Sequence, residues 1–259
     1  MMQQVLAFLR RDVLRNIVAL KMLTAYPDAI QAHYYENGAD AGALLLLPTA
    51  VSAFDRQTYP SADYVVLLSA THPQIARALL AHVPSDCALV FKLVKADQRE
   101  VVAQRFRLTR ATAYISYTAA AGSRFMPSKE VVVSDRIDER SVAFYAAQGY
   151  ALDEVQSYFS TGRALLFALY QRDAPVAACF AYPNFERVYE IGGVYTLPEA
   201  RRKGYARKLV ETALDAVVCR GDRPRYQVHE RNQPSIRLAE AIGLERFATI
   251  EHWLCERSS

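Results

Sequence analysis

A short basic loop is the part of the chain whose residue types and spacing best suit phosphate binding. The segment Arg201-Arg202-Lys203-Gly204-Tyr205-Ala206 places three basic residues just before a glycine. The apolar residues that follow recur at helical spacing: Leu209, Val210, Ala213, Leu214 and Val217. A helix that begins at this loop directs its unpaired N–H groups and its positive dipole end at the loop. Acidic residues normally favour a helix start, so basic residues here indicate a bound polyanion.

A second block near the C-terminus has the pattern of a strand followed by a capped helix. Residues 226–229 alternate in polarity as a strand does, and a helix is expected over 234–242. Asn232 suits the N-cap, Pro234 suits the first turn, and Gly243 suits a left-handed stop after the helix. An ordinary capped helix would explain these residues singly. Their significance comes from their position after the basic loop.

Together, the two blocks resemble the GNAT superfamily of acyl-CoA-dependent N-acyltransferases. The family's pyrophosphate loop has the pattern Arg/Gln-x-x-Gly-x-Gly/Ala, and residues 201–206 fit it at every fixed position. The family's closing motif is a strand, then Asn-x-x-Ala/Ser, then a helix ending in Gly-Phe/Leu, and residues 226–244 follow it. The resemblance is specific over residues 186–250. It implies acetyl-CoA or another acyl-CoA as co-substrate.

The resemblance also implies which residues hold the acyl-CoA. The strand before the loop would pair with the pantetheine arm, and the N–H of Val194 would bond the acyl carbonyl oxygen and its developing negative charge. The residues expected to bind acyl-CoA are Val194, Tyr195, Thr196, Arg201, Arg202, Lys203, Gly204, Tyr205, Ala206, Arg207, Asn232 and Ser235. A solvated basic turn that merely caps a helix is the alternative interpretation of the loop.

Acyl transfer to an amine also needs a base, because an alkyl amine with a solution pKa of ~10 is mostly protonated at neutral pH. Glu190 lies eleven residues before Arg201. The resemblance implies a catalytic role for it, since the histone-acetylating branch of the family has its catalytic glutamate at this position. A carboxylate on the open face of the sheet is the alternative. Glu186 and Glu230 are the other candidate bases.

Two adjacent glycines interrupt the strand that carries Glu190. Gly192-Gly193 is locally unfavourable in a strand and predicts a β-bulge or a close approach of the backbone to another group. Alternatively, the glycines make room for a neighbouring aromatic side chain such as Phe180 or Tyr182.

The chain departs from the family at one position. Many members have a tyrosine seven residues after the motif asparagine, and this tyrosine protonates the leaving CoA thiolate. Here that position is Ala239. A thiol has a pKa of only ~8.5, so its thiolate leaves with modest help. Tyr226, His229 or Ser235 could supply the proton, and the spacing does not choose among them.

Composition favours a globular protein and argues against several other classes. A chain of 259 residues, 52% of them hydrophobic, can fill one large core or two small ones. A net charge of +4 does not suggest a nucleic-acid partner. The four cysteines are scattered without histidines at ligand spacing, so no metal site is expected. No apolar run reaches membrane-spanning length and no signal peptide is evident, so we expect no membrane partner and a cytoplasmic location.

The order of predicted elements indicates two similar halves. The first, residues 1–120, begins with a helix over 2–24, then a hairpin around Asn37-Gly38, and continues strand, helix, strand, helix, strand. The second, residues 121–259, has a similar order and holds both motifs. We predict a mixed α+β protein with the GNAT fold, a mostly antiparallel mixed sheet flanked by helices. The N-terminal half would be a degenerate GNAT-like repeat, as in glycine N-acyltransferases, which this layout resembles; an unrelated α/β cap is the alternative.

The expected activity follows from these assignments. The chain is predicted to be an N-acetyltransferase that moves an acetyl or other short acyl group from acyl-CoA to a primary amine by direct attack in a ternary complex. The expected acceptor is a small-molecule amine or a protein amine, and the expected oligomeric state is a monomer or a homodimer. A CoA-binding regulatory module without turnover is an alternative of another class. A nucleic-acid-binding protein that uses the loop arginines is a third, less favoured reading.

Overall fold

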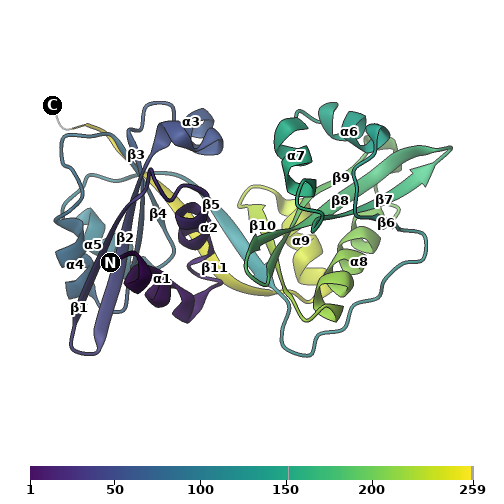
Figure 1. Ribbon diagram of the computed structural model, residues 1–259. Helices are drawn as coiled ribbons and strands as arrows, with labels where there is room; N and C mark the ends of the chain where they lie inside the picture. Colours follow the sequence, from purple (N-terminus) through teal and green to yellow (C-terminus); the bar gives the residue numbers. More distant parts are fainter. Residues whose placement is uncertain (151, 258–259) are drawn as a thin grey trace. The chain divides into compact units, whose positions relative to one another are not determined.

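The computed structural model describes residues 1–150 and 152–257, which form two compact units (Figure 1). Unit 1 comprises Met1–Ile115 and the stretch from Ala248 onward, and unit 2 comprises Ser116–Phe247. This division differs from the predicted one at 120/121 chiefly because the end of the C-terminal strand packs in unit 1. Both units combine helices with strands of mixed direction, which agrees with the predicted fold class. Among the described helices, none is long and apolar enough to cross a membrane.

Unit 1 contains strands in the order β1-β2-β3-β4-β11-β5. The strands are β1 (Gln31–Asn37), β2 (Asp40–Pro48), β3 (Tyr64–Ala70), β4 (Leu89–Leu93), β5 (Thr109–Thr118) and β11 (Glu245–Cys255). The helices are α1 (Met2–Leu9), α2 (Ile17–Ala25), α3 (Ala53–Thr58), α4 (Pro73–Leu80) and α5 (Ala96–Ala103). The predicted hairpin is confirmed, since β1 and β2 pair antiparallel up to Asn37 opposite Asp40.

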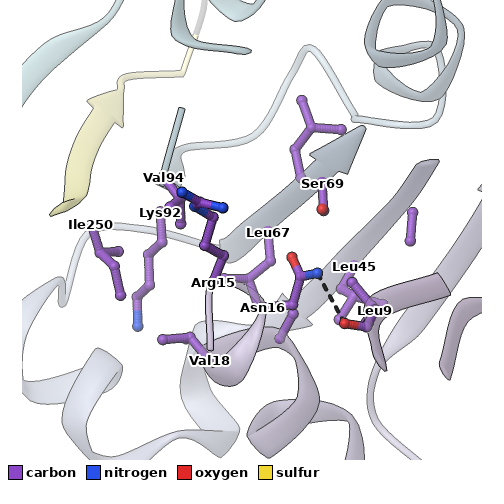
Figure 2. Close-up of a pocket in the computed structure, with 13 residues that line it drawn as sticks. Leu9, Arg15, Asn16, Val18, Leu45, Leu67, Ser69, Lys92, Val94 and Ile250 are labelled. Carbon is purple, nitrogen blue, oxygen red and sulfur yellow. Dashed lines mark hydrogen bonds between the residues drawn. The ribbon is translucent and has the colours of Figure 1, made fainter. Parts of the chain in front are cut away.

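The two faces of the unit 1 sheet are both covered, which explains the continuous apolar run in β2. Leu44 and Leu46 belong to the core under α4 and α5. Leu45 instead lines a small cavity together with Leu9 and Val18, on the side of α1 and α2 (Figure 2). The cavity drawn there has a volume of about 20 Å³, which is room for about one water molecule.

Two features of unit 1 differ from the sequence-based expectation. The helix predicted over 2–24 is broken, because Asn16 Nδ2 donates to the backbone oxygen of Leu9 (3.0 Å) and Asp12 Oδ1 accepts the N–H of Arg15 (3.1 Å). Side chains that bond to nearby backbone groups in this way compete with helix continuation. Helix α3 was not predicted; it is only six residues long and begins at Ser52, whose side chain accepts the N–H of Asp55.

Unit 2 contains strands in the order β5-β10-β9-β8-β7-β6. The strands not yet given are β6 (Val132–Ser134), β7 (Leu165–Gln171), β8 (Ala174–Phe185), β9 (Val188–Thr196) and β10 (Arg223–His229). The helices are α6 (Glu139–Ala146), α7 (Leu152–Phe159), α8 (Tyr205–Cys219) and α9 (Gln233–Ile242). Helices α6 and α7 cover one face of this sheet and α8 covers the other (Figure 1).

The two units repeat one arrangement of strands and helix. In unit 1, β3 and β4 are parallel, joined by α4, and β2 pairs antiparallel with β3. In unit 2, β9 and β10 are parallel, joined by α8, and β8 pairs antiparallel with β9. Each parallel pair needs a crossover, which the helix provides. The predicted tandem architecture is therefore visible in the topology of each half.

Candidate functional site

Strand β9 loses one of its neighbours part-way along its length. Its parallel pairing with β10 runs from Val188 opposite Arg223 to Ile191 opposite Tyr226. Among the described residues this pairing goes no further, although β9 extends to Thr196. On its other side β9 stays paired with β8 as far as Thr196. The edge of β9 from residue 192 onward is therefore open toward β10, and its backbone groups are available to a partner other than a strand.

A cleft of about 670 Å³ lies at this opening, within the usual size range of ligand sites. Its walls are the end of β9, the loop before α8, and the first turns of α8 and α9. The lining residues are Val194, Tyr195, Thr196, Ala200, Arg201, Arg202, Gly204, Tyr205, Ala206, Arg207, Asn232, Pro234, Ser235, Arg237 and Leu238. Four of these are arginines and none is acidic, so the lining favours an anionic ligand.

The cleft brings together the residues that the sequence assigned to acyl-CoA binding, with one exception. Lys203 is exposed and is not part of the lining. Four lining residues were missed: Ala200, Pro234, Arg237 and Leu238. Three of them could have been predicted from their spacing in α9, because positions 234, 237 and 238 follow the i, i+3, i+4 pattern that places side chains on one helix face. Ala200 carried no such signal.

The start of α8 is arranged to bind an anion. Gly204 is the N-cap with φ of 78°, and Arg202 also has a positive φ of 62°. A Cβ added to Gly204 would meet nothing within 4 Å, so backbone conformation rather than space explains the glycine. No side chain caps α8 and its first turn holds no acidic residue. Its first N–H groups and its dipole therefore face the cleft without a protein partner from the cap.

The neighbouring side chains are held in place around Tyr195. Arg201 Nε donates to the backbone oxygen of Thr196 (3.1 Å), and its guanidinium lies 5.7 Å from the Tyr195 ring centre. The Tyr195 ring meets Phe144 edge-on at 5.7 Å. Thr196 Oγ1 is buried and has no hydrogen-bond partner among the described residues. A buried hydroxyl without a partner is costly, so this atom is one that a ligand could satisfy.

A β-bulge lies just before the cleft. Ala178 pairs with Tyr195 and Phe180 pairs with Gly192. Cys179, which lies between Ala178 and Phe180, is therefore opposite two residues of β9, Gly193 and Val194. Gly193 has φ of 61°, and a Cβ there would lie 2.1 Å from Phe180 Cε1. Both interpretations of the glycine pair are therefore confirmed: the strand bulges, and the glycine makes room for Phe180. The hydroxyl of Tyr145 donates to the Gly193 oxygen (3.1 Å) and fixes the bulge further.

Glu190 is buried, with 6% of its surface exposed, so the alternative of a carboxylate on an open sheet face is wrong. It lies between Tyr182 on β8 and Arg225 on β10, which are its register partners. Its Oε2 accepts from Arg225 Nη1 (2.5 Å) and from Asn184 Nδ2 (3.0 Å). Arg225 Nη2 in turn donates to Ser116 Oγ (3.2 Å). The parallel register of β9 and β10 places Arg225 here, and no local sequence pattern predicts this contact.

Comparison with known proteins agrees with this geometry. Residues 132–244 match the model of the Acetyltransferase (GNAT) family. This segment of the chain is a GNAT acetyltransferase domain. GNAT domains of this kind transfer acyl groups from acyl-CoA, which fits an anion-binding cleft at a splayed strand edge. No curated protein matches the chain.

Several solved structures share the fold over nearly the whole chain. A GNAT-family acetyltransferase from Colwellia psychrerythraea is 9% identical, with a TM-score of 0.62, covering 95% of this chain and 97% of that one. A GCN5-related N-acetyltransferase from Kribbella flavida is 16% identical, with a TM-score of 0.58, covering 93% and 95%. A tandem GNAT protein from the clavulanic acid biosynthesis pathway is 12% identical, with a TM-score of 0.54, covering 94% and 88%. At these identities the likeness shows the fold, here a tandem GNAT fold.

The other two candidate bases lie in turns. Glu186 is in the turn between β8 and β9, before the start of β9. It is eight residues from Val194, roughly 25 Å along an extended strand. Glu230 lies in the turn between β10 and α9, two residues before Asn232, which lines the cleft. Glu190 is four residues before Val194 on the same strand and Glu186 is eight, and none of the three carboxylates is in the cleft lining.

The groups considered as general acids differ in their access to the cleft. Ala239 is fully buried, so its position offers no side chain that reaches the cleft. Ser235 lines the cleft, and the buried Tyr226 interacts with it. Burial raises the pKa of Tyr226 to about 12, so its phenol is protonated at neutral pH. His229 Nδ1 accepts the N–H of Arg231 (3.1 Å), which leaves the Nε2 of a neutral ring as its proton donor.

The matching region of unit 1 is filled by its own side chains. Strand β3 also extends beyond its pairing with β4. There, with the Gln98 amide turned so that both of its polar atoms have partners, its oxygen accepts the N–H of Ala70 and its nitrogen donates to the oxygen of Leu68, both at 3.1 Å. Lys95 Nζ donates to the Ala70 oxygen (3.2 Å). The backbone edge that is open in unit 2 is thus satisfied from within unit 1. The basic glycine loop is also absent there, and α4 instead begins at His72.

Proposed function

We propose that the chain is an N-acetyltransferase that moves an acetyl or other short acyl group from acyl-CoA to a primary amine by direct attack in a ternary complex. One observation carries the proposal: the open edge of β9 and the uncapped start of α8 face the same arginine-lined cleft. The open edge suits the amide groups of a pantetheine arm, and the helix start suits a diphosphate. A pantetheine arm and a diphosphate are both parts of coenzyme A.

The residues of the cleft would share the chemistry as follows. The N–H of Val194, just after the bulge, would hold the acyl carbonyl oxygen and the negative charge that develops on it. The amine nitrogen attacks the carbonyl carbon, and the carbon–sulfur bond breaks as the carbon–nitrogen bond forms. Glu190 would take the proton from the amine, directly or through a water molecule. The CoA thiolate leaves with modest help because the pKa of a thiol is only ~8.5.

The remaining acyl-CoA residues would bind the non-reacting part of the donor. Tyr195 and Thr196 would continue the backbone contacts, and Arg201, Arg202 and Arg207 would face the phosphates with the amides of Gly204, Tyr205 and Ala206. Asn232 caps α9 through a bond from the N–H of Ser235 (3.3 Å), which fixes the opposite wall of the cleft. Lys203 is assigned only a long-range electrostatic contribution, because it does not line the cleft.

Two measurements test the proposal. Calorimetry with CoA should show saturable binding, and a thiol-release assay with acetyl-CoA and a panel of primary amines should find an acceptor. Glu190→Gln should lower thiol release at least about tenfold while CoA binding is kept, because the change removes a proton acceptor outside the cleft lining. An absence of saturable binding at millimolar CoA would refute the proposal. An unchanged rate in Glu190→Gln would remove Glu190 from the mechanism.

A catalytically weak CoA-binding regulatory module is the second candidate. The observation that favours it is the buried Ala239, which leaves the usual tyrosine position without a proton donor. This reading predicts CoA binding of normal strength and no thiol release above the solvent rate with any amine. The amine acceptor, the monomeric or homodimeric state and the cytoplasmic location stay predictions from the sequence.

A further inference from the structure

A line of four polar side chains crosses the unit 2 sheet and includes one residue of β9, the strand whose end lines the cleft. Asn184 on β8, Glu190 on β9, Arg225 on β10 and Ser116 on β5 are linked by hydrogen bonds of 3.0, 2.5 and 3.2 Å. Glu190 and Arg225 are buried, with 6% and 3% of their surfaces exposed. Removing such groups from water costs free energy, and their mutual attraction often only balances that cost. Stability alone is therefore a weak explanation for this line.

The contacts to the Glu190 carboxylate are asymmetric. Asn184 Nδ2 and Arg225 Nη1 both donate to Oε2. Among the described residues no side chain or backbone group donates to Oε1. A carboxylate has lone pairs on both oxygens, so the two donors occupy one oxygen and leave the other free to accept a proton.

Two further atoms of the same cluster lack partners among the described residues. Arg225 Nε and Asn184 Oδ1 are buried and make no hydrogen bond. A purely structural polar network normally satisfies its buried members. Asn184 and Arg225 each leave one buried polar atom without a hydrogen bond, yet both donate to Oε2 of Glu190. This arrangement suits two residues that orient the Glu190 carboxylate.

We propose that Asn184 and Arg225 are positioning residues that fix Oε2 of Glu190 and so present Oε1 as the proton acceptor in acyl transfer. The inference rests on the proposed function, in which Glu190 is the base. In the transfer step a proton leaves the amine nitrogen and binds Oε1, directly or through a water molecule. Glu190 becomes a neutral acid, Arg225 keeps its charge, and the proton later passes to solvent.

The ionisable groups that face Glu190 are few. Arg225 approaches from β10 and Tyr182 from β8, and Tyr158 from α7 stacks on Tyr182 with ring centres 3.9 Å apart. Burial, followed by the charge of Glu190, holds the pKa of Tyr182 well above its usual value, so its phenol stays neutral. Arg225 is therefore the charged side chain in direct contact with the Glu190 carboxylate.

Variants of the two ends of the line test the inference without removing a buried charge. Asn184→Ala removes one donor to Oε2. Ser116→Ala removes the hydrogen bond that Arg225 Nη2 donates to Ser116 Oγ. Thr118→Val is the matched control: Thr118 is also on β5 and donates a buried hydrogen bond to β10, but to the Pro224 oxygen (2.7 Å) instead of Arg225. The readouts are kcat and KM for amine and acyl-CoA, the pH profile of kcat/KM, and CoA affinity by calorimetry.

We expect Asn184→Ala to lower kcat about tenfold and Ser116→Ala about threefold, with the KM for acyl-CoA and the CoA affinity unchanged. The acid limb of the pH profile should move to higher pH in both, since losing a donor or loosening a counter-charge disfavours the ionised carboxylate. Thr118→Val should change neither kcat nor the profile. Arg225→Lys should keep more activity than Arg225→Gln, because it keeps the charge. The double variant Glu190→Gln/Arg225→Gln, which leaves no buried charge, checks that the site still folds and binds CoA.

The outcomes separate this inference from the proposed function. If Glu190→Gln abolishes thiol release but Asn184→Ala and Ser116→Ala match Thr118→Val in rate and pH profile, the positioning role is wrong and the function stands. If the two variants lose rate with no movement of the acid limb, they act through stability alone, and the inference is again wrong. If Glu190→Gln keeps the full rate, the base assignment fails and the positioning role fails with it.

Discussion

Gly193→Ala is the substitution whose consequence the structure defines most sharply. The added Cβ would lie 2.1 Å from Cε1, 2.7 Å from Cδ1 and 2.8 Å from Cζ of Phe180. No real Cβ contact is this short, so the ring or the strand must move. Phe180 is 3% exposed and packs in the core beneath α6 and α7, where Tyr145 and Tyr158 restrict its ring. A simple rotation of the ring therefore cannot relieve the contact.

The expected cost has two parts. Alanine at a φ of 61° costs about 1–2 kcal/mol in backbone strain. Overpacking of a closed core costs a further 1–3 kcal/mol or so. We expect Gly193→Ala to lower the free energy of unfolding by about 2–5 kcal/mol, which is a large share of the stability of an ordinary domain.

The adjacent glycine is the matched control. Gly192 has no left-handed φ, and a Cβ there would lie 3.4 Å from the nearest atom of Phe180, an ordinary contact. Gly192→Ala should therefore cost less than about 1 kcal/mol, as well-tolerated substitutions do. Denaturant unfolding monitored by fluorescence and by far-UV circular dichroism measures both variants. Combining Gly193→Ala with Phe180→Leu should cost less than the sum of the two single substitutions, because the smaller side chain relieves the overpacking. Equal midpoints for the two alanine variants would refute the reasoning, because space and φ are the only differences invoked.

Two further predictions concern charge. Arg202→Glu should weaken CoA binding, measured by calorimetry, at least about tenfold, because Arg202 lines the cleft. Lys203→Glu makes the same charge change just outside the cleft lining and should weaken binding less. Equal losses would show that the cleft geometry is not what binds the phosphates. The raised pKa of Tyr226 makes the folded chain hold its phenolic proton longer than the unfolded chain does, so this residue's contribution to stability is complete below about pH 10 and falls by up to about 3 kcal/mol as pH rises toward 12. Tyr226→Phe should flatten that part of the alkaline fall in denaturation midpoints compared at about pH 9 and about pH 11, and an unchanged slope would assign the fall to other tyrosines.

Local sequence patterns predicted most of the helices and strands around the site and most of the residues that line the cleft. Several local patterns predicted backbone features that the structure contains. They are the helical periodicity after Gly204, the capping residues Asn232 and Gly243, and the glycine pair at 192–193. Such signals act within one or two turns of chain, so they can be recognised without knowing what packs against them. For the same reason the basic loop and the residues beside it could be assigned to one site.

The contacts between these elements depend on the tertiary structure. The register of β9 against β10 places Arg225 beside Glu190, and nothing near either residue in the sequence predicts that pairing. The end of the parallel pairing at Ile191 opens the strand edge, and α9 brings Arg237 to the cleft from a separate segment. In unit 1 the same topology is closed by Gln98, a residue with no distinguishing sequence pattern. These features depend on contacts between segments far apart in the chain, whose free energies are set by packing and register, so no local pattern of residues encodes them.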